Sequence, residues 1–303
     1  MSDSSNAVAG KDIGTGAPRG VHDYLPWVIW TPSLVLLVAI YWNVGRSLYN
    51  NWTLTDSYYT HGFLIPPISA FLVWQRRAVL LRTKRAPSWL GALLMACSSV
   101  MLLLADFLGF NVFAQLSLLP MLTGLVLAAF GPRYLKLVWF PLFFLIFMVP
   151  IPPSLTQSII LDIKLLATEG AVRIARLCSL SMIREGSYVH FGQERLLVGE
   201  VCGGLRSLIA LLSFGTLMAY ISKTTRWAKV VILLLSGPIA IVSNTARIFA
   251  LCVIGYFWGA DAASGVVHDV SGILIFACAF GLLFLLETIL RRIAPKDEGG
   301  PAS

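Results

Sequence analysis

Long apolar runs separated by short polar stretches dominate the hydrophobic pattern of the chain. Because a helix that crosses a membrane needs about 20 mostly apolar residues, this pattern predicts membrane spans. We expect eight of them, at about 26–45, 61–75, 89–109, 112–130, 134–150, 203–221, 228–250 and 266–290. The second is short and carries Pro66-Pro67, and the seventh is interrupted near Gly237-Pro238 and again at Asn244.

Composition excludes a soluble globular protein. Of the 303 residues 57% are hydrophobic and only 13% are charged, whereas soluble proteins carry about 25% charged residues. Mean hydropathy is +0.78. The net charge of +8 does not indicate nucleic-acid binding, because the basic residues cluster in the loops between spans, where they act as orientation signals.

The basic loops predict the orientation of the chain. Lysine and arginine gather at 75–88, 131–137 and 222–229 and in the tail after 290, all on one side if eight spans alternate. That side is expected to be the cytoplasm, so both termini lie inside. We therefore predict a disordered cytoplasmic N-terminus at 1–24, one transmembrane domain at 25–292 and a cytoplasmic tail at 293–303.

The segment 151–202 is the only long outward-facing loop. Its first half, from Ser154 to Ser179, has the pattern of an amphipathic helix that lies along the outer membrane interface. Its second half has two alternating stretches, 187–192 and 195–198, that predict a β-hairpin leading into Cys202. The predicted fold class is thus an all-α polytopic membrane protein with a small extracytoplasmic helix and hairpin.

Cys202 lies where this outer loop enters the sixth span. A helix N-terminus there favours a thiolate over a thiol. Arg206 follows one helical turn later, on the same face, and Gly203 and Gly204 leave room for another backbone to approach the sulfur. Two alternatives stay open: Cys202 is an inert packing residue, or it forms a disulfide with Cys178.

Two other spans bring ionisable groups to the same predicted depth. Arg247 lies 18 residues beyond Lys229, a rise of ~27 Å along a helix, and Asn244 accompanies it. His268 opens the last span at the outer face. Each alone is compatible with an interfacial residue. Together with Cys202 they match the needs of thiol catalysis: a nucleophile, a proton-transfer partner and a stabiliser of an oxyanion. His61, at the start of the second span, is a further candidate for this pocket.

With these residues assembled, the chain resembles the exosortase family of membrane transpeptidases, which is related to the archaeosortases. The matching motifs appear in order along most of the chain. They are Tyr59-Thr60-His61-Gly62, Val149-Pro150-Ile151-Pro152, Cys202-Gly203-Gly204-Leu205-Arg206-Ser207, Asn244-Thr245-Ala246-Arg247-Ile248, and His268-Asp269 with Gly272. Gly203 departs from the family pattern, where Ser or Ala more often precedes the glycine, which leaves the subtype open.

The resemblance implies a cysteine peptidase or transpeptidase at the periplasmic face of the bacterial inner membrane. Its catalytic residues would be Cys202 as nucleophile, Arg247 as oxyanion stabiliser and His268 as proton donor and acceptor. Arg206, Asn244, His61, Gly203 and Gly204 are candidate substrate-binding or supporting residues. Substrates would be exported proteins with a C-terminal Pro-containing motif, a transmembrane helix and a basic tail. The acceptor could be an envelope-linked amine, since the family is associated with exopolysaccharide producers.

Two other functions are compatible with a polytopic membrane chain. A transporter or channel subunit of polysaccharide export would explain the spans, but the sequence shows no internal repeat and no acidic residue at mid-membrane. A cysteine-dependent membrane acyltransferase would share the nucleophile. The five cysteines form no CxxC motif or metal-ligand spacing, so we expect neither a metal nor a cofactor.

Overall fold

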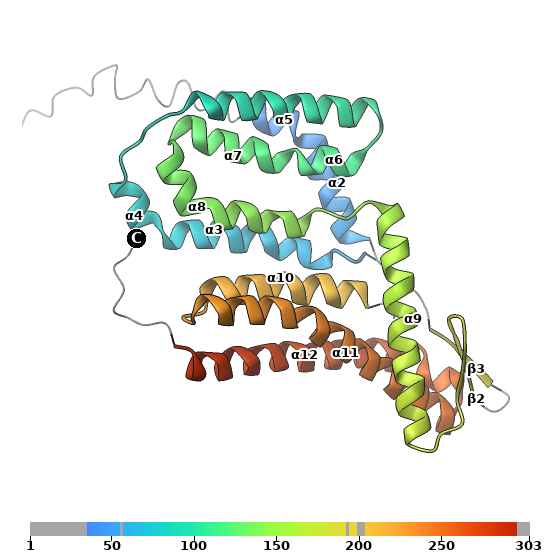
Figure 1. Cartoon of the computed structure of the whole chain (residues 1–303). Coiled ribbons are helices and arrows are strands. Elements are labelled where there is room, and N and C mark those ends of the chain that lie inside the picture. The colour runs from blue at the N-terminus through green and yellow to red at the C-terminus, as the bar shows by residue number, and fades with distance from the viewer. Residues whose placement is uncertain (1–34, 55–56, 192–193, 199–203, 296–303) are drawn as a thin grey trace, which may run out of the picture. The chain divides into compact units, whose positions relative to one another are not determined.

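The computed structural model describes residues 35–54, 57–191, 194–198 and 204–295 (Figure 1). The chain divides into two units, residues 1–43 and 44–303. In the first unit the described residues, 35–43, are almost entirely helical. The sections that follow concern the second unit.

Helices make up most of the second unit. Its principal helices are α2 (Trp42–Thr53, entering from the first unit), α3 (Ile65–Gln75), α4 (Arg77–Arg82), α5 (Trp89–Phe107), α6 (Asn111–Leu116), α7 (Leu118–Ala129), α8 (Pro132–Phe144), α9 (Pro153–Leu177), α10 (Leu205–Ile221), α11 (Arg226–Trp258) and α12 (Gly265–Ile293). Short 3₁₀ turns η1 (Thr60–Leu64), η2 (Leu145–Met148) and η4 (Ala260–Ala263) join some of them.

Four helical segments within the described residues are long and apolar enough to cross a membrane: Trp89–Phe107, Asn111–Ala129, Arg226–Trp258 and Gly265–Ile293. The expected count of eight is not confirmed. Three more predicted spans correspond to α3, α8 and α10, which have only 11, 13 and 17 residues. The first predicted span, 26–45, lies mostly outside the described residues. The chain is a multi-pass membrane protein with a mainly helical fold.

Prolines explain how the two irregular spans fold. Pro66 and Pro67 occupy the first turn of α3, where a missing backbone N–H removes no helical hydrogen bond. The predicted interruption of the seventh span is wrong, because α11 is one helix of 33 residues with Pro238 inside it. Proline removes one hydrogen bond there, and α11 stays continuous, packed against α9, α10 and α12.

Helices α10, α11 and α12 lie side by side (Figure 1). Small residues allow the close approach of α10 and α11: a Cβ added at Gly215 would lie 2.7 Å from Cβ of Ser236. Directly after the C-terminal end of α10, Ser222 donates a 2.7 Å hydrogen bond to the buried carboxylate of Glu287 on α12. This three-helix group supplies most of the candidate site.

Helix α9 confirms that a helix occupies the first half of the 151–202 segment, while its place at the membrane interface stays a prediction. A small sheet packs beside it (Figure 1). Strands β2 (Tyr188–Phe191) and β3 (Glu194–Leu197) pair antiparallel, as predicted, with Val189 opposite Leu196. The hairpin prediction was incomplete, because β1 (Ile183–Glu185) adds a third antiparallel strand. Strand β1 has only three residues, two of which are charged, so it lacks the apolar alternation that could have predicted it.

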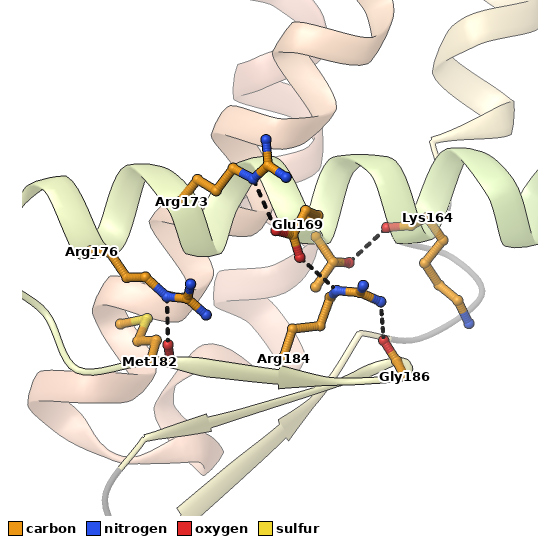
Figure 2. A network of polar contacts seen from close by, with 8 residues as sticks. Lys164, Glu169, Arg173, Arg176, Met182, Arg184 and Gly186 are labelled. Carbon is orange, nitrogen blue, oxygen red and sulfur yellow. Dashed lines mark hydrogen bonds and ion pairs between the residues drawn. The ribbon is translucent and has the colours of Figure 1, made fainter.

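An ion-pair network ties β1 to α9 (Figure 2). Glu169 of α9 accepts hydrogen bonds from Nε of Arg173, at 2.9 Å, and from Nε of Arg184 on β1, at 3.0 Å. These two hydrogen bonds lower the pKa of the Glu169 carboxyl. Beneath the network, buried apolar residues of α9, the sheet and α11 form one cluster that includes Ala171, Val189 and Ile248.

Candidate functional site

A pocket of about 630 Å³ lies between η1 on one side and α10, α11 and α12 on the other. Its walls combine residues from distant parts of the sequence: Thr60, His61, Leu64, Gly204, Arg206, Ser207, Ala210, Arg247, Gly272, Ile273 and Phe276. Four of the candidate residues, His61, Gly204, Arg206 and Arg247, thus line one cavity. Among the described residues, the lining includes two arginines and no carboxylate, so this part of the pocket favours electron-rich groups such as carbonyl or carboxylate oxygens.

Arg247 of α11 contacts His268 of α12 within this site. Its Nη2 donates a 2.9 Å hydrogen bond to the backbone carbonyl of His268 and lies 3.3 Å from the imidazole Nε2. A guanidinium has only donors, so Nε2 accepts this contact and the proton of a neutral ring lies on Nδ1. The sequence placed these two residues at one depth, and in the structure they touch.

A glycine makes room for this arginine on the surface of α12. A Cβ added at Gly272 would lie 2.8 Å from Nη2 of Arg247, closer than a carbon can approach without displacing the guanidinium. Ser271 provides a further contact, since its Oγ accepts a 3.4 Å hydrogen bond from Nε of Arg247. One turn of α12 therefore fixes the arginine at three points.

Asn244 lies against the beginning of α10. Gly204 precedes that helix with a positive φ of 74°, a backbone conformation that glycine adopts without strain. A Cβ at this position would lie 2.6 Å from Nδ2 of Asn244, which is itself buried. Cys202 and Gly203, two of the predicted site residues, lie outside the described residues. Gly204, their nearest described neighbour, lines the pocket.

Of the two cysteines in the alternative disulfide, Cys178 and Cys202, only Cys178 lies in the described residues. Cys178 follows α9, is exposed and is unpaired among the described cysteines. Within the described residues, no cluster of histidine, cysteine, aspartate and glutamate has the arrangement needed to hold a metal ion.

His61 reaches the pocket from a turn that several contacts hold in place. Tyr59, just before η1, is buried, and its hydroxyl accepts a 2.8 Å hydrogen bond from the backbone N–H of Ile151. Burial raises the pKa of this phenol to about 12, so it stays neutral. Trp52 packs over Gly62, where an added Cβ would lie 2.4 Å from the indole nitrogen, and donates a 3.0 Å hydrogen bond to the carbonyl of Met148.

Sequence reasoning missed some members of the site. Ser271 lies one turn after His268, a spacing that could have suggested a shared helix face. Phe276 and Ser207 also line the pocket, but apolar and hydroxyl residues in a span carry no signal that separates pocket lining from packing.

Comparison with known proteins identifies the family of the chain. No curated protein and no solved structure matches the chain. A family model described as transmembrane exosortase matches residues 50–285, well over half of the chain. This range contains every described residue of the pocket. The chain therefore belongs to the transmembrane exosortase family.

Proposed function

We propose that the protein is a membrane cysteine transpeptidase that cleaves the C-terminal sorting signal of exported proteins. Family membership supports a membrane transpeptidase role, since the family acts on exported proteins with C-terminal signals. The observation that carries the proposal is the contact of Arg247 with His268, in a site whose pocket Gly204 also lines. Gly204 stands two residues after Cys202 in the sequence.

In the proposed mechanism Cys202 attacks the scissile carbonyl. The thiol proton passes to Nε2 of His268, and the new carbon–sulfur bond moves an electron pair onto the carbonyl oxygen. Once Nε2 is protonated it no longer accepts a hydrogen bond from Arg247. The guanidinium can then donate to the oxyanion, in the manner of other oxyanion-stabilising groups.

Collapse of this intermediate breaks the carbon–nitrogen bond. His268 returns its proton to the leaving amine, and a thioester to Cys202 remains. Water or an acceptor amine attacks the thioester, gives up a proton through His268 and restores the thiol. Under this proposal the site faces the periplasm, and a helix of the substrate lies beside the spans so that its motif reaches the depth of Cys202.

Replacement of Cys202 by alanine tests the proposal. We expect Cys202→Ala to abolish processing of a co-expressed exported reporter that ends in a Pro-Glu-Pro motif, an apolar helix and a basic tail. Processing is measured as the loss of the tail on a gel. Normal processing by this variant would refute a thiol mechanism.

A trapped intermediate separates this function from lipid acylation. Mass spectrometry of wild-type protein quenched in acid should detect the reporter peptide attached to Cys202 as a thioester. A fatty acyl group at that position would instead favour the acyltransferase alternative.

A further inference from the structure

Several buried side-chain nitrogens and oxygens lack a hydrogen-bond partner among the described residues. Three of these atoms belong to residues that line the same pocket. They are Nδ1 and Nε2 of His61 and Nε of Arg206. Buried polar groups in folded proteins nearly always have partners, and each exception needs an explanation. The remaining unpartnered atoms belong to four described residues outside the lining of this pocket.

The two residues enter the pocket from different parts of the chain. His61 lies on η1 and Arg206 on the first turn of α10, 145 positions later. The backbone of Phe147 makes a weak polar contact with the imidazole, but neither ring nitrogen has a hydrogen bond of normal distance and angle to a described residue. Arg247, by contrast, has three polar contacts, all on α12.

The position of His61 is built into the fold. Tyr59 and Gly62 flank it, and both are fixed by contacts to other elements: Tyr59 to Ile151 and Gly62 to Trp52. A turn held on both sides presents its side chain in one place. The imidazole, which has no hydrogen bond of normal geometry among the described residues, therefore has a position fixed by the fold.

We propose that His61 and Arg206 form a polar clamp that hydrogen-bonds the main chain of the substrate peptide in this pocket. Arg206 donates through Nε to a peptide carbonyl, and His61, which has one donor and one acceptor when neutral, pairs with a peptide N–H or C=O. Both groups thereby gain hydrogen-bond partners that the described residues do not supply. The clamp binds substrate and leaves the bond-breaking chemistry to other residues. It rests on the proposed function, because it assumes a peptide substrate.

Binding is best measured in the inert Cys202→Ala protein, with the tailed reporter protein as the probe. In detergent or nanodiscs, Cys202→Ala/His61→Phe should bind the reporter about tenfold more weakly than Cys202→Ala, the effect of one lost hydrogen bond to a buried group. Cys202→Ala/His61→Gln should retain affinity within about threefold, since an amide also donates and accepts. Cys202→Ala/Arg206→Met should weaken binding to a similar extent as His61→Phe.

A stability measurement separates binding from a structural role. Phenylalanine removes two buried nitrogens without partners, so His61→Phe should unfold at the same temperature as its parent or at a higher one. If His61 instead stabilised the fold, His61→Phe would unfold at a lower temperature than its parent. His190, paired with Glu185 at 3.1 Å in the sheet, is the matched control: His190→Phe should leave reporter binding unchanged.

Unchanged reporter affinity in the His61→Phe protein would overturn the clamp, and so would a loss of thermal stability that parallels the loss of binding. If His61→Phe does not fold, a large loss of affinity in the folded His61→Gln protein would overturn it as well. This failure is distinct from that of the proposed function. A Cys202→Ala protein that still processes the reporter refutes the thiol mechanism, whereas an inert Cys202→Ala protein with clamp variants of full affinity refutes the clamp alone.

Discussion

At the scale of single residues, two glycines determine where the polar groups of the site lie. Gly204 lets Asn244 pack directly on the backbone that begins α10, and Gly272 lets the guanidinium of Arg247 lie on α12. Neither glycine has chemistry of its own. Their effect is steric, because any side chain would occupy the space that the polar group now fills.

Replacement of Gly272 tests this steric role. Gly272→Ala would bring a methyl group 2.8 Å from Nη2 of Arg247 and move the guanidinium away from His268. We expect at least about a tenfold loss of reporter processing, since small displacements of a charge-stabilising group are costly to catalysis. The variant should still insert and fold.

The same helix provides the control. Gly281 also lies on α12, and a Cβ added there meets nothing within 4 Å. Gly281→Ala should process the reporter at the wild-type rate. Equal activity of Gly272→Ala and Gly281→Ala would contradict the steric role of Gly272.

At the scale of elements, α9 and the three-stranded sheet form a module attached to α11. Apolar side chains of α9, the sheet and α11 are buried together, and Glu169 joins α9 to β1 through Arg184. The sheet precedes Cys202 in the sequence, so we expect its attachment to influence the start of α10.

The attachment of β1 to α9 should weaken at acidic pH. Arg173 and Arg184 lower the pKa of Glu169 below its ordinary value of 4.5. A lowered pKa in the folded state means that the ion pairs stabilise the protein above about pH 4.5 and lose this effect as the pH falls through the folded-state pKa. We therefore measure hydrogen exchange of the β1 amides in the wild type and in Glu169→Gln at each pH. The ratio of the wild-type rate to the variant rate should rise only in that acidic range.

The comparison with Glu169→Gln removes the intrinsic effect of pH on exchange. At neutral pH the variant should exchange β1 amides faster than the wild type, and in acid the two should converge. A constant difference between the proteins at every pH would show that ionisation of Glu169 does not hold the sheet.

At the scale of the whole molecule, the chain exposes a large apolar surface that a membrane would cover. In α12, one of the four long apolar segments, only 17% of the most hydrophobic window is buried within the protein. Such a surface is typical of helices that face lipid. The basic loops then predict that the side with Cys202 and Cys178 faces away from the cytoplasm.

Thiol labelling tests this orientation. In variants that keep a single cysteine, Cys178 or Cys202, a membrane-impermeant maleimide should react with intact spheroplasts. A cysteine introduced by Lys84→Cys into the basic 75–88 loop should react only after the membrane is opened. Labelling of Lys84→Cys from outside, or of Cys202 only after lysis, would contradict the predicted topology.

Local sequence pattern determined which segments are helices and strands. Apolar runs located α5, α10 and α12 to within a few residues, and alternation located β2 and β3, because these periodicities depend only on neighbouring positions. The same reasoning missed β1, whose pairing with β2 depends on the sheet. It also placed an interruption in α11 at Pro238, where packing by neighbouring helices overrides a local preference.

The sequence by itself also determined a candidate site: motifs on separate spans, placed at one depth by charge and length, nominated Arg247, His268 and Cys202. The position of Cys202 relative to the other two stays a prediction. Only the tertiary structure decided that Arg247 and His268 touch, that Gly272 makes room for Arg247 and that His61 lines the same pocket as Arg247. Contacts between residues on different helices depend on how the helices pack, and packing is a property of the whole fold that no local pattern encodes.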